Sequence, residues 1–259
     1  NITATLSELV TTAASITVTL DNGQTVVLSH SSENNTLTGS YTIGSGQSSS
    51  DLGISSYALT SAPTDVAGNV MTSTTMPAGN ISGTRAIVVD TTTPTVSSFS
   101  STTSDGAYKA GSTINITATL SEAVTTAASI TVTLDNGKTV VLTHNAVNNT
   151  LTGTYTVAAG DSSADLNVSS YVLTSAPADA AGNIMSDLTV PSGSNNIAGS
   201  KTIVVDTTAP STPSTPDLAT ASDLGSSSTD NNTADDTPTI SIGSGLLIGA
   251  TVTITATHG

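Results

Sequence analysis

The strongest constraint on this chain is that it repeats itself. Residues 1–77 align without a gap on residues 115–191, and 55 of the 77 positions are identical. The second copy then gains two residues, and the copies meet again at the sequences IVVDTTTP (87–94) and IVVDTTAP (203–210). A long, fixed period of this kind is typical of structural modules that follow one another along a chain. We therefore predict a repeat unit of about 116 residues.

The two copies do not begin at the same point of the repeat. Residues 95–114 have no counterpart in the first copy, so we expect that copy to lack its first strand. The predicted regions are a first module at 1–90, a complete second module at 91–206, and an acidic linker with the truncated start of a different module at 207–259. We expect a segment of a much longer protein. The alternative is that a neighbouring chain donates the missing strand by β-strand addition.

Within each copy, apolar residues alternate with polar ones, which is typical of half-buried β-strands, and no helical stripe is present. The sequence Asp-Asn-Gly at 21–23 and 135–137 predicts tight hairpin turns. About seven strands in about 110 residues fit an immunoglobulin-like β-sandwich. We therefore predict an all-β chain of tandem immunoglobulin-like sandwich modules joined end to end. The strands expected in the second copy are 95–101, 113–121, 129–135, 138–144, 149–157, 168–175 and 201–206.

The composition excludes several classes of function. Four Lys and Arg residues stand against 19 Asp and Glu residues, for a net charge of −15, so we expect no nucleic-acid partner. The chain has no Cys, which removes thiolate metal sites, disulfides and a Cys nucleophile. No apolar run reaches the length of a membrane span, so we expect no membrane insertion in this segment.

Several motifs together resemble a known family. They are TSDGAYKAGS (103–112), LSEAV (120–124), AAGDSSADL (158–166), DAAGN (179–183) and VVDTTAP (204–210). The set resembles the tandem bacterial Ig-like repeats of giant secreted cell-surface adhesins, of the biofilm-associated or type-I-secreted repeats-in-toxin kind. This resemblance covers essentially all of residues 1–210. It implies an extracellular protein, at the bacterial surface or secreted, with calcium at the module junctions.

Alternation of loops between the two ends of a sandwich predicts where the acidic residues gather. One set should lie at the near end of each module, where the chain enters it, and a further set at the far end of the second module, where the chain leaves it. The near-end set of the second copy is Glu122, Asp179 and Asn183, facing the incoming Asp90. The equivalent set of the first copy is Glu8, Asp65 and Asn69, and the far-end set is Asp105, Asp161, Asp165 and Asp206.

Carboxylates that converge with few basic partners repel one another, and a hard divalent cation relieves that repulsion. Calcium takes 6–8 oxygen ligands from carboxylates, amides, carbonyls and water. We therefore predict Ca²⁺ as the bound ion and these acidic residues and asparagines as its ligands. The alternative is that loop acids only keep the surface soluble. For the later acids at 217, 223, 230, 235 and 236, a calcium-binding linker and a solvated spacer are weighed equally.

No catalytic motif accompanies these features. The chain has no His-x-x-x-His spacing, no phosphate-binding loop and no Gly-x-Ser-x-Gly elbow. We therefore expect a non-enzymatic extender of a surface adhesin, whose partners are neighbouring modules of the same chain and an adhesion target reached through other domains. Two alternatives stay open: a module that binds glycan or protein, and a spacer in a secreted polysaccharide-degrading enzyme.

Overall fold

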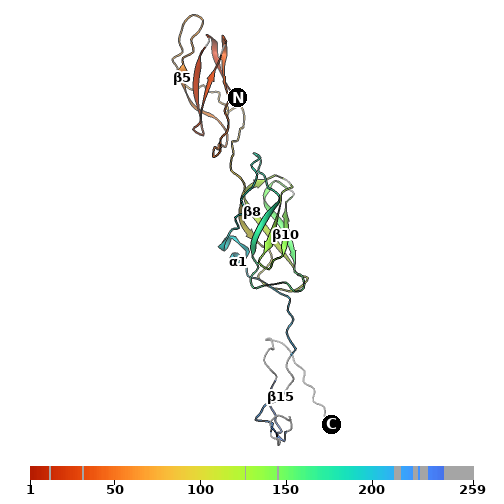
Figure 1. The fold of residues 1–259 in the computed structure, drawn as a ribbon. Coiled ribbons are helices and arrows are strands. Elements are labelled where there is room, and N and C mark those ends of the chain that lie inside the picture. The colour runs from red at the N-terminus through yellow and green to blue at the C-terminus, as the bar shows by residue number, and fades with distance from the viewer. Residues whose placement is uncertain are drawn as a thin grey trace.

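A computed structural model describes residues 1–241 except residues 12, 31, 126, 145, 213–216, 224–226 and 228–232. The described chain is almost entirely β-structure, as the alternating sequence predicts, and its sheets belong to an all-β sandwich fold (Figure 1). The part of the predicted further module at 242–259 lies outside the described residues.

The second repeat is built from a six-stranded and a three-stranded sheet. The large sheet has the order β13-β9-β10-β11-β8-β6 and is antiparallel throughout. The small sheet has the order β12-β14-β7, in which β14 and β7 run parallel. The strands are β6 (Val96–Ser100), β7 (Gly106–Tyr108), β8 (Thr113–Val124), β9 (Ser129–Leu134), β10 (Thr139–Thr143), β11 (Asn148–Thr156), β12 (Ser162–Ser163), β13 (Val168–Ser175) and β14 (Ile203–Asp206).

The first repeat forms a five-stranded sheet of order β1-β4-β3-β2-β5. Its strands are β1 (Ile2–Val10), β2 (Ser15–Leu20), β3 (Thr25–Ser29), β4 (Asn34–Gly39) and β5 (Ile54–Ser61). The equivalent of the small sheet is reduced to a bridge between Ser49 and Val89, where the second repeat pairs Ser163 with Val205. The first repeat therefore keeps the main sheet but has no described strand in the place of β6.

All seven strands expected in the second repeat are present, and the structure adds two. The first addition is β7, which follows β6 in the chain and lies in the other sheet. The second addition, β12, has two residues and pairs with the end of β14. Neither segment is long enough to display a two-residue period, so alternation could not have identified them.

Each repeat has its own hydrophobic core, and the two share no residue. One core extends from Ile2 to Val89 and the other from Val96 to Val205. The second core joins the large sheet, through residues such as Ile116, to Ile203 and Val205 of the small sheet, which is how a sandwich buries its inner faces. We call the connecting residues 90–95 the linker (Figure 1).

Helical structure in the described chain is confined to one corner of the second repeat. A 3₁₀ turn (η1, Gly193–Asn195) leads into a single turn of α-helix (α1, Ile197–Ser200), and Asn196 caps it through its side chain. The same buried Asn196 side chain exchanges hydrogen bonds with the backbone of Val168 and so ties this corner to β13. No described helix is long and apolar enough to span a membrane. After the second repeat, β15 (Asp217–Leu218) pairs with β16 (Ile240–Ser241).

Candidate metal centre

Three carboxylates meet where the linker enters the second repeat. Asp90, Glu122 and Asp179 each offer an oxygen, and these oxygens all lie within 4.8 Å of one another. Asp90 and Glu122 are half-buried and Asp179 is buried. Within the part of the chain that the structure describes, this is the one group of three potential metal-ligating side chains so close together. The structure thus brings together three of the residues that were predicted to lie at the near end.

A tight turn aims Asp179 at this point. The turn begins at a bridge between Ala178 and Ile184 and closes through hydrogen bonds from the Gly182 and Asn183 backbone. Gly182 has φ +91°, a conformation that favours glycine because it has no Cβ. The Asp179 carboxylate accepts the Asn183 amide N–H at 2.8 Å and the Asn183 side-chain Nδ2 at 2.7 Å. Asp179 is therefore held in one orientation by its own loop.

Asn183 also connects this loop to the linker. Its Nδ2 donates to the carbonyl oxygen of Asp90 at 3.1 Å. The Asp90 carboxylate accepts the Thr92 amide at 2.9 Å, and the preceding Val89 is buried in the core of the first repeat. A ligand shared by Asp90 and the two second-repeat carboxylates would thus bind both sides of the junction.

Burial and the two neighbouring carboxylates make ionisation of Glu122 less favourable. Burial, and then the negative charges of Asp179 and Asp90, raise the pKa of Glu122 above its usual value. The pKa of Asp179 lies below its usual value although burial alone raises it, because the hydrogen bonds from Asn183, Gly182 and Ala181 together outweigh burial. The loop therefore keeps Asp179 ionised, and the mutual repulsion falls on Glu122.

The equivalent residues of the first repeat form only part of this arrangement. Asn69 donates its backbone and side-chain N–H groups to Asp65, both at 2.7 Å, and the side-chain bond lowers the pKa of Asp65. Glu8 is exposed. No third carboxylate joins Glu8 and Asp65 among the described residues. Among the described residues, the first repeat thus has the Asp65 turn but no group of three carboxylates.

The predicted far-end set is split by the structure, and this corrects the expectation that it gathers at Asp206. Asp105 and Asp165 accept the amides of Thr202 and Ile203, which places them at the start of β14. Asp206 lies at the other end of that strand and accepts the Thr208 amide at 2.8 Å. Loop alternation predicts the end of a module but cannot resolve the two ends of a four-residue strand.

Asp161 lies beside the exit as predicted, but its partners are protein groups. Its carboxylate accepts the Tyr155 hydroxyl at 2.6 Å and the Ala158 amide at 2.8 Å, and it pairs with Lys138 Nζ at 2.9 Å. The Tyr155 and Lys138 bonds lower the pKa of Asp161 to about 2. A carboxylate neutralised in this way does not need a cation.

Sequence reasoning missed Lys138 as the partner of Asp161, although the repeat contains the signal. The equivalent residues of the first copy are Gln24 and Gln47. Gln47 accepts the Tyr41 hydroxyl at 2.6 Å, as Asp161 accepts that of Tyr155. Two positions that change together from glutamine to an opposite-charge pair indicate a contact.

The later acidic residues are placed only in part. Asp217 lies in β15, Asp235 accepts the Ser222 hydroxyl at 3.0 Å, and Asp236 lies beside it in the chain. Asp223 is buried, and its Oδ1 has no hydrogen-bond partner among the described residues. Asp230 lies outside the described residues.

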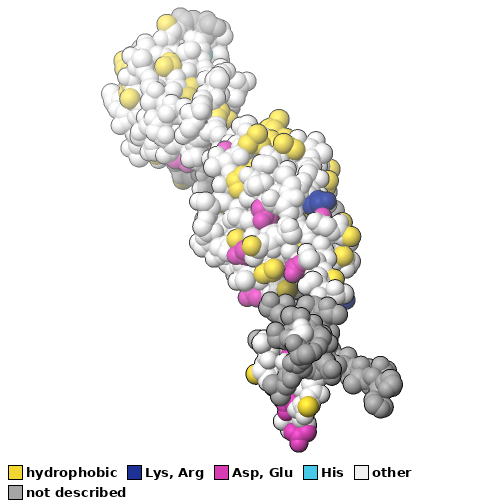
Figure 2. Space-filling model, turned by 60° about the horizontal axis from the view of Figure 1, so that its bottom comes forward, with side chains coloured by type: hydrophobic (Ala, Val, Ile, Leu, Met, Phe, Trp, Pro, Cys, Tyr) yellow, Lys and Arg dark blue, Asp and Glu magenta, His cyan; other side chains and the backbone are white. Residues whose placement is uncertain are grey.

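The donor set at the junction suits a hard cation. It consists of three carboxylates with neither a sulfur nor an imidazole group, which is the chemistry that Ca²⁺ prefers. Burial and the charges of Asp179 and Asp90 raise the pKa of Glu122, so a cation at this point would favour its ionised form. Elsewhere acidic side chains are scattered over the visible surface with few basic ones (Figure 2). Those scattered acids fit the solubility interpretation.

Comparison with family models, with curated proteins and with solved structures gave no match for this chain.

Proposed function

We propose that this chain is a non-enzymatic extender of a bacterial surface adhesin, in which Ca²⁺ stiffens the joint between successive β-sandwich modules. The modules act as spacers that project a distal binding domain from the cell, and their direct partners are the neighbouring modules. The resemblance to adhesin repeats and the tandem copies of one module support this function.

One observation carries the proposal. Asp90 belongs to the linker, Glu122 to β8 and Asp179 to a loop of the second repeat, and their oxygens lie within 4.8 Å of one another. A cation bound by all three would restrict how the linker leaves the first repeat. Asn183 Nδ2, which donates to Asp90 and Asp179, already holds these two residues together.

The energy expected of such a site suits a joint better than a folding core. Extracellular modules bind Ca²⁺ with Kd values of about 10⁻⁴ to 10⁻³ M. At about 1 mM free Ca²⁺, one site then stabilises the bound state by about 0.4–1.4 kcal/mol. This is small beside the stability of a domain, but it is enough to favour one linker orientation severalfold.

The experiment is a calcium titration of the full chain, followed by isothermal calorimetry and by small-angle scattering. We expect saturable binding in the range of about 10⁻⁴ to 10⁻³ M. We also expect the distribution of interatomic distances to narrow on adding Ca²⁺ and to broaden again with EDTA. Scattering curves that superimpose in the two conditions would count against the stiffening role.

A matched pair of variants localises the effect. Glu122→Gln removes one of the three junction carboxylates, and Glu8→Gln removes the equivalent residue of the first repeat, where no third carboxylate is described. We expect Glu122→Gln to weaken calcium binding at least about tenfold, as the loss of a charged ligand should, and Glu8→Gln to leave this site unchanged. Equal effects of the two substitutions would exclude the junction as the site.

A further inference from the structure

The Asp-Asn-Gly turns at 21–23 and 135–137 place an asparagine directly before a glycine in each repeat. Such a pair is chemically labile, because a glycine nitrogen with no neighbouring Cβ is free to attack the asparagine side chain. Attack of the Gly137 nitrogen on Cγ of Asn136 forms a succinimide and releases the side-chain nitrogen as ammonia. Water then opens the ring at either of its carbonyls and leaves aspartate or isoaspartate. Each repeat therefore carries a residue that can gain a negative charge without an enzyme.

The folded turn holds the reacting atoms apart. Gly137 donates its N–H to the Leu134 carbonyl at 3.0 Å, which closes a four-residue turn. Asp135 and Asn136 are its central residues and neither has a positive φ, so the turn is of type I. In that turn the Gly137 nitrogen is nearly eclipsed with the backbone nitrogen of Asn136, whereas ring closure requires it to be eclipsed with Cβ. The attacking nitrogen therefore faces away from Cγ until the turn opens.

Two hydrogen bonds also hold the Asn136 side chain. Its Nδ2 donates to the Tyr155 hydroxyl at 2.9 Å, and its Oδ1 accepts the backbone amide two residues later at 3.1 Å. In the first repeat, Asn22 donates to the Tyr41 hydroxyl at 2.8 Å and accepts the amide two residues later at 3.2 Å. Cγ cannot reach the glycine nitrogen while both bonds are made. Deamidation of either residue thus requires that the turn separates from its tyrosine.

The two tyrosine hydroxyls differ in the group to which they donate. Tyr155 donates to the Asp161 carboxylate at 2.6 Å, whereas Tyr41 donates to the uncharged Gln47 at the same distance of 2.6 Å. Burial and the hydrogen bond to Asp161 raise the pKa of Tyr155 to about 12, so this hydroxyl keeps its single proton at neutral pH. A carboxylate in place of the Asn136 amide would be a second anion at that one proton. In the first repeat, the new carboxylate would share its tyrosine with a neutral side chain.

We propose that Asn22 and Asn136 are latent modification sites, which stay amides while their turns are closed and become aspartate or isoaspartate when the turns open. The first repeat accepts this change with a small loss of stability, whereas the second repeat is destabilised more, because two carboxylates then compete for the Tyr155 hydroxyl. Loss of ammonia makes the modification irreversible. It therefore records each opening of the turn, and a modified second repeat opens more readily than before.

The first test compares the full chain in buffer with the same chain unfolded in urea, both at neutral pH. Peptide mapping by mass spectrometry measures the deamidation rate of each asparagine. We expect Asn22 and Asn136 to deamidate at least about tenfold more slowly in the folded chain, because the hydrogen bonds of the glycine nitrogen and of both side-chain atoms must break before the ring closes. Equal rates in the two conditions would overturn the proposal.

Tyrosine variants locate the protection. Tyr155→Phe removes the hydroxyl that holds Asn136, and Tyr41→Phe does the same for Asn22. We expect each substitution to accelerate deamidation of its own asparagine about fivefold, as the loss of one hydrogen bond implies, and to leave the other asparagine unchanged. Unchanged rates at both positions would show that the tyrosines do not protect the turns.

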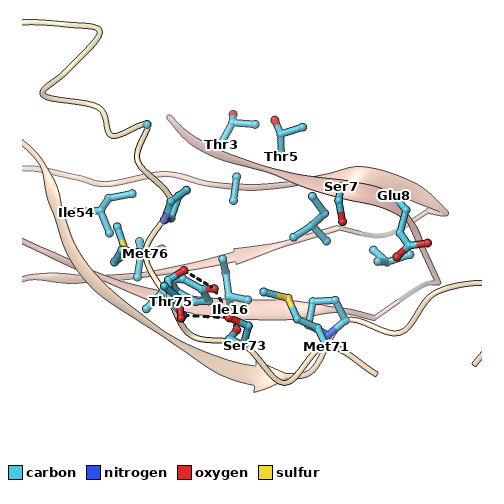
Figure 3. Close-up of a pocket in the computed structure, with 18 of the residues that line it drawn as sticks. Thr3, Thr5, Ser7, Glu8, Ile16, Ile54, Met71, Ser73, Thr75 and Met76 are labelled. Atoms are coloured by element: carbon cyan, nitrogen blue, oxygen red, sulfur yellow. Dashed lines mark hydrogen bonds between the residues drawn. The ribbon is translucent and has the colours of Figure 1, made fainter. Parts of the chain in front are cut away.

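A second tyrosine of each repeat supplies the matched control. Tyr57 donates to the carbonyl oxygen of Ser73 at 3.0 Å, one of the dashed bonds beside that residue in Figure 3. Tyr171 donates to the carbonyl oxygen of Asp187 at 2.9 Å and so holds a different segment from the turn. We expect Tyr171→Phe to leave the rate at Asn136 unchanged. An acceleration equal to that of the other variant would attribute the protection to general stability and overturn the assignment to the turn.

Aspartate variants test the difference between the repeats, since they reproduce one of the two products. We expect Asn136→Asp to lower the urea midpoint of the second repeat, followed by its NMR signals, more than Asn22→Asp lowers that of the first. In the background of Lys138→Gln and Asp161→Gln, which gives the second repeat the residues of the first, the two shifts should become equal. If Asn136→Asp alone does not fold, this background should restore folding. Equal shifts in the unaltered background would overturn the proposed difference.

Discussion

Lys138 and Asp161 form an ion pair of 2.9 Å at positions where the first repeat has Gln24 and Gln47. The surroundings are otherwise alike, because Tyr41 and Tyr155 both donate to this position at 2.6 Å. The tyrosine hydroxyl therefore meets a neutral acceptor, Gln47, in the first repeat and an ion-paired carboxylate, Asp161, in the second. We therefore expect the stability of the two repeats to depend differently on pH.

The charged pair predicts a component of acid-dependent stability in the second repeat that the first repeat, with glutamines at these positions, lacks. The folded pKa of Asp161 is about 2, below its usual value of 3.8, so the pair contributes stability above about pH 3.8 that is lost as pH falls toward 2. We expect the double substitution Lys138→Gln and Asp161→Gln to remove this component. Hydrogen exchange followed by mass spectrometry between pH 2 and 7 would measure each repeat separately, with the first repeat as the internal control. An unchanged pH dependence in the double variant would contradict the prediction.

Glu122 predicts the opposite dependence when calcium is absent. Its folded pKa is raised, so the contribution of Glu122 to the stability of the second repeat is most favourable below the ordinary glutamate value of 4.5 and is lost as pH rises through the folded pKa. In EDTA at pH 7 we expect Glu122→Gln to stabilise the second repeat slightly, by about 0.5 kcal/mol or less, because partly exposed charges interact weakly. With calcium present, the same substitution should lose the stabilisation that the ion gives. Urea unfolding in the two conditions tests the change of sign.

The contact of Asn183 with the linker predicts a difference between two equivalent substitutions. Asn183→Ala removes donors to both Asp179 and Asp90, whereas Asn69→Ala removes the donor to Asp65 only. Each substitution should destabilise the turn that contains it by about 1 kcal/mol. We expect Asn183→Ala alone to increase the relative motion of the two repeats, measured by comparing the rotational correlation times of each repeat by NMR relaxation. Equal motion in the two variants would show that the contact does not restrain the linker.

Phe99 predicts how much β6 contributes to the second repeat. Its ring is 1% exposed, so Phe99→Ala should destabilise the second repeat by about 3–5 kcal/mol. Val141→Ala, on a side chain that is 52% exposed, should cost less than about 0.5 kcal/mol and serves as the control. Urea unfolding followed by residue-specific NMR signals separates the repeats. A loss similar to that of the control would mean that β6 is not a structural part of the core.

The sequence predicts the strands well because a half-buried sheet imposes a period of two residues. Val96 and Phe99 show where this signal weakens, since a register shift in β6 separates two buried residues by three positions instead of two. The sequence Asp-Asn-Gly at 135–137 also predicts the hairpin turn in which Gly137 has φ +76°. By contrast, β12 is defined by its pairing with Val205 and Asp206, which no local pattern reveals.

The candidate site was predictable to the level of a module end and no further. Alternating loops bring Asp90, Glu122 and Asp179 together because long strands separate the two ends clearly. The prediction from loop alternation fails for Asp105 and Asp165, whose carboxylates accept backbone amides at the start of a short strand. Acid counting alone also cannot distinguish a carboxylate that has a lysine partner, such as Asp161, from one that has none.

The shared sequence of β1 and β8 creates an ambiguity for folding. Residues 1–8 and 115–122 have the same sequence, so a newly formed β6 meets two edges that offer equivalent contacts. The correct pairing is then selected by chain connectivity, since β6 is joined to β8 through the short segment 101–112 and to the first repeat through the linker. A change in either connection would alter the kinetic partition between native pairing and a misfolded state in which the wrong repeat is completed.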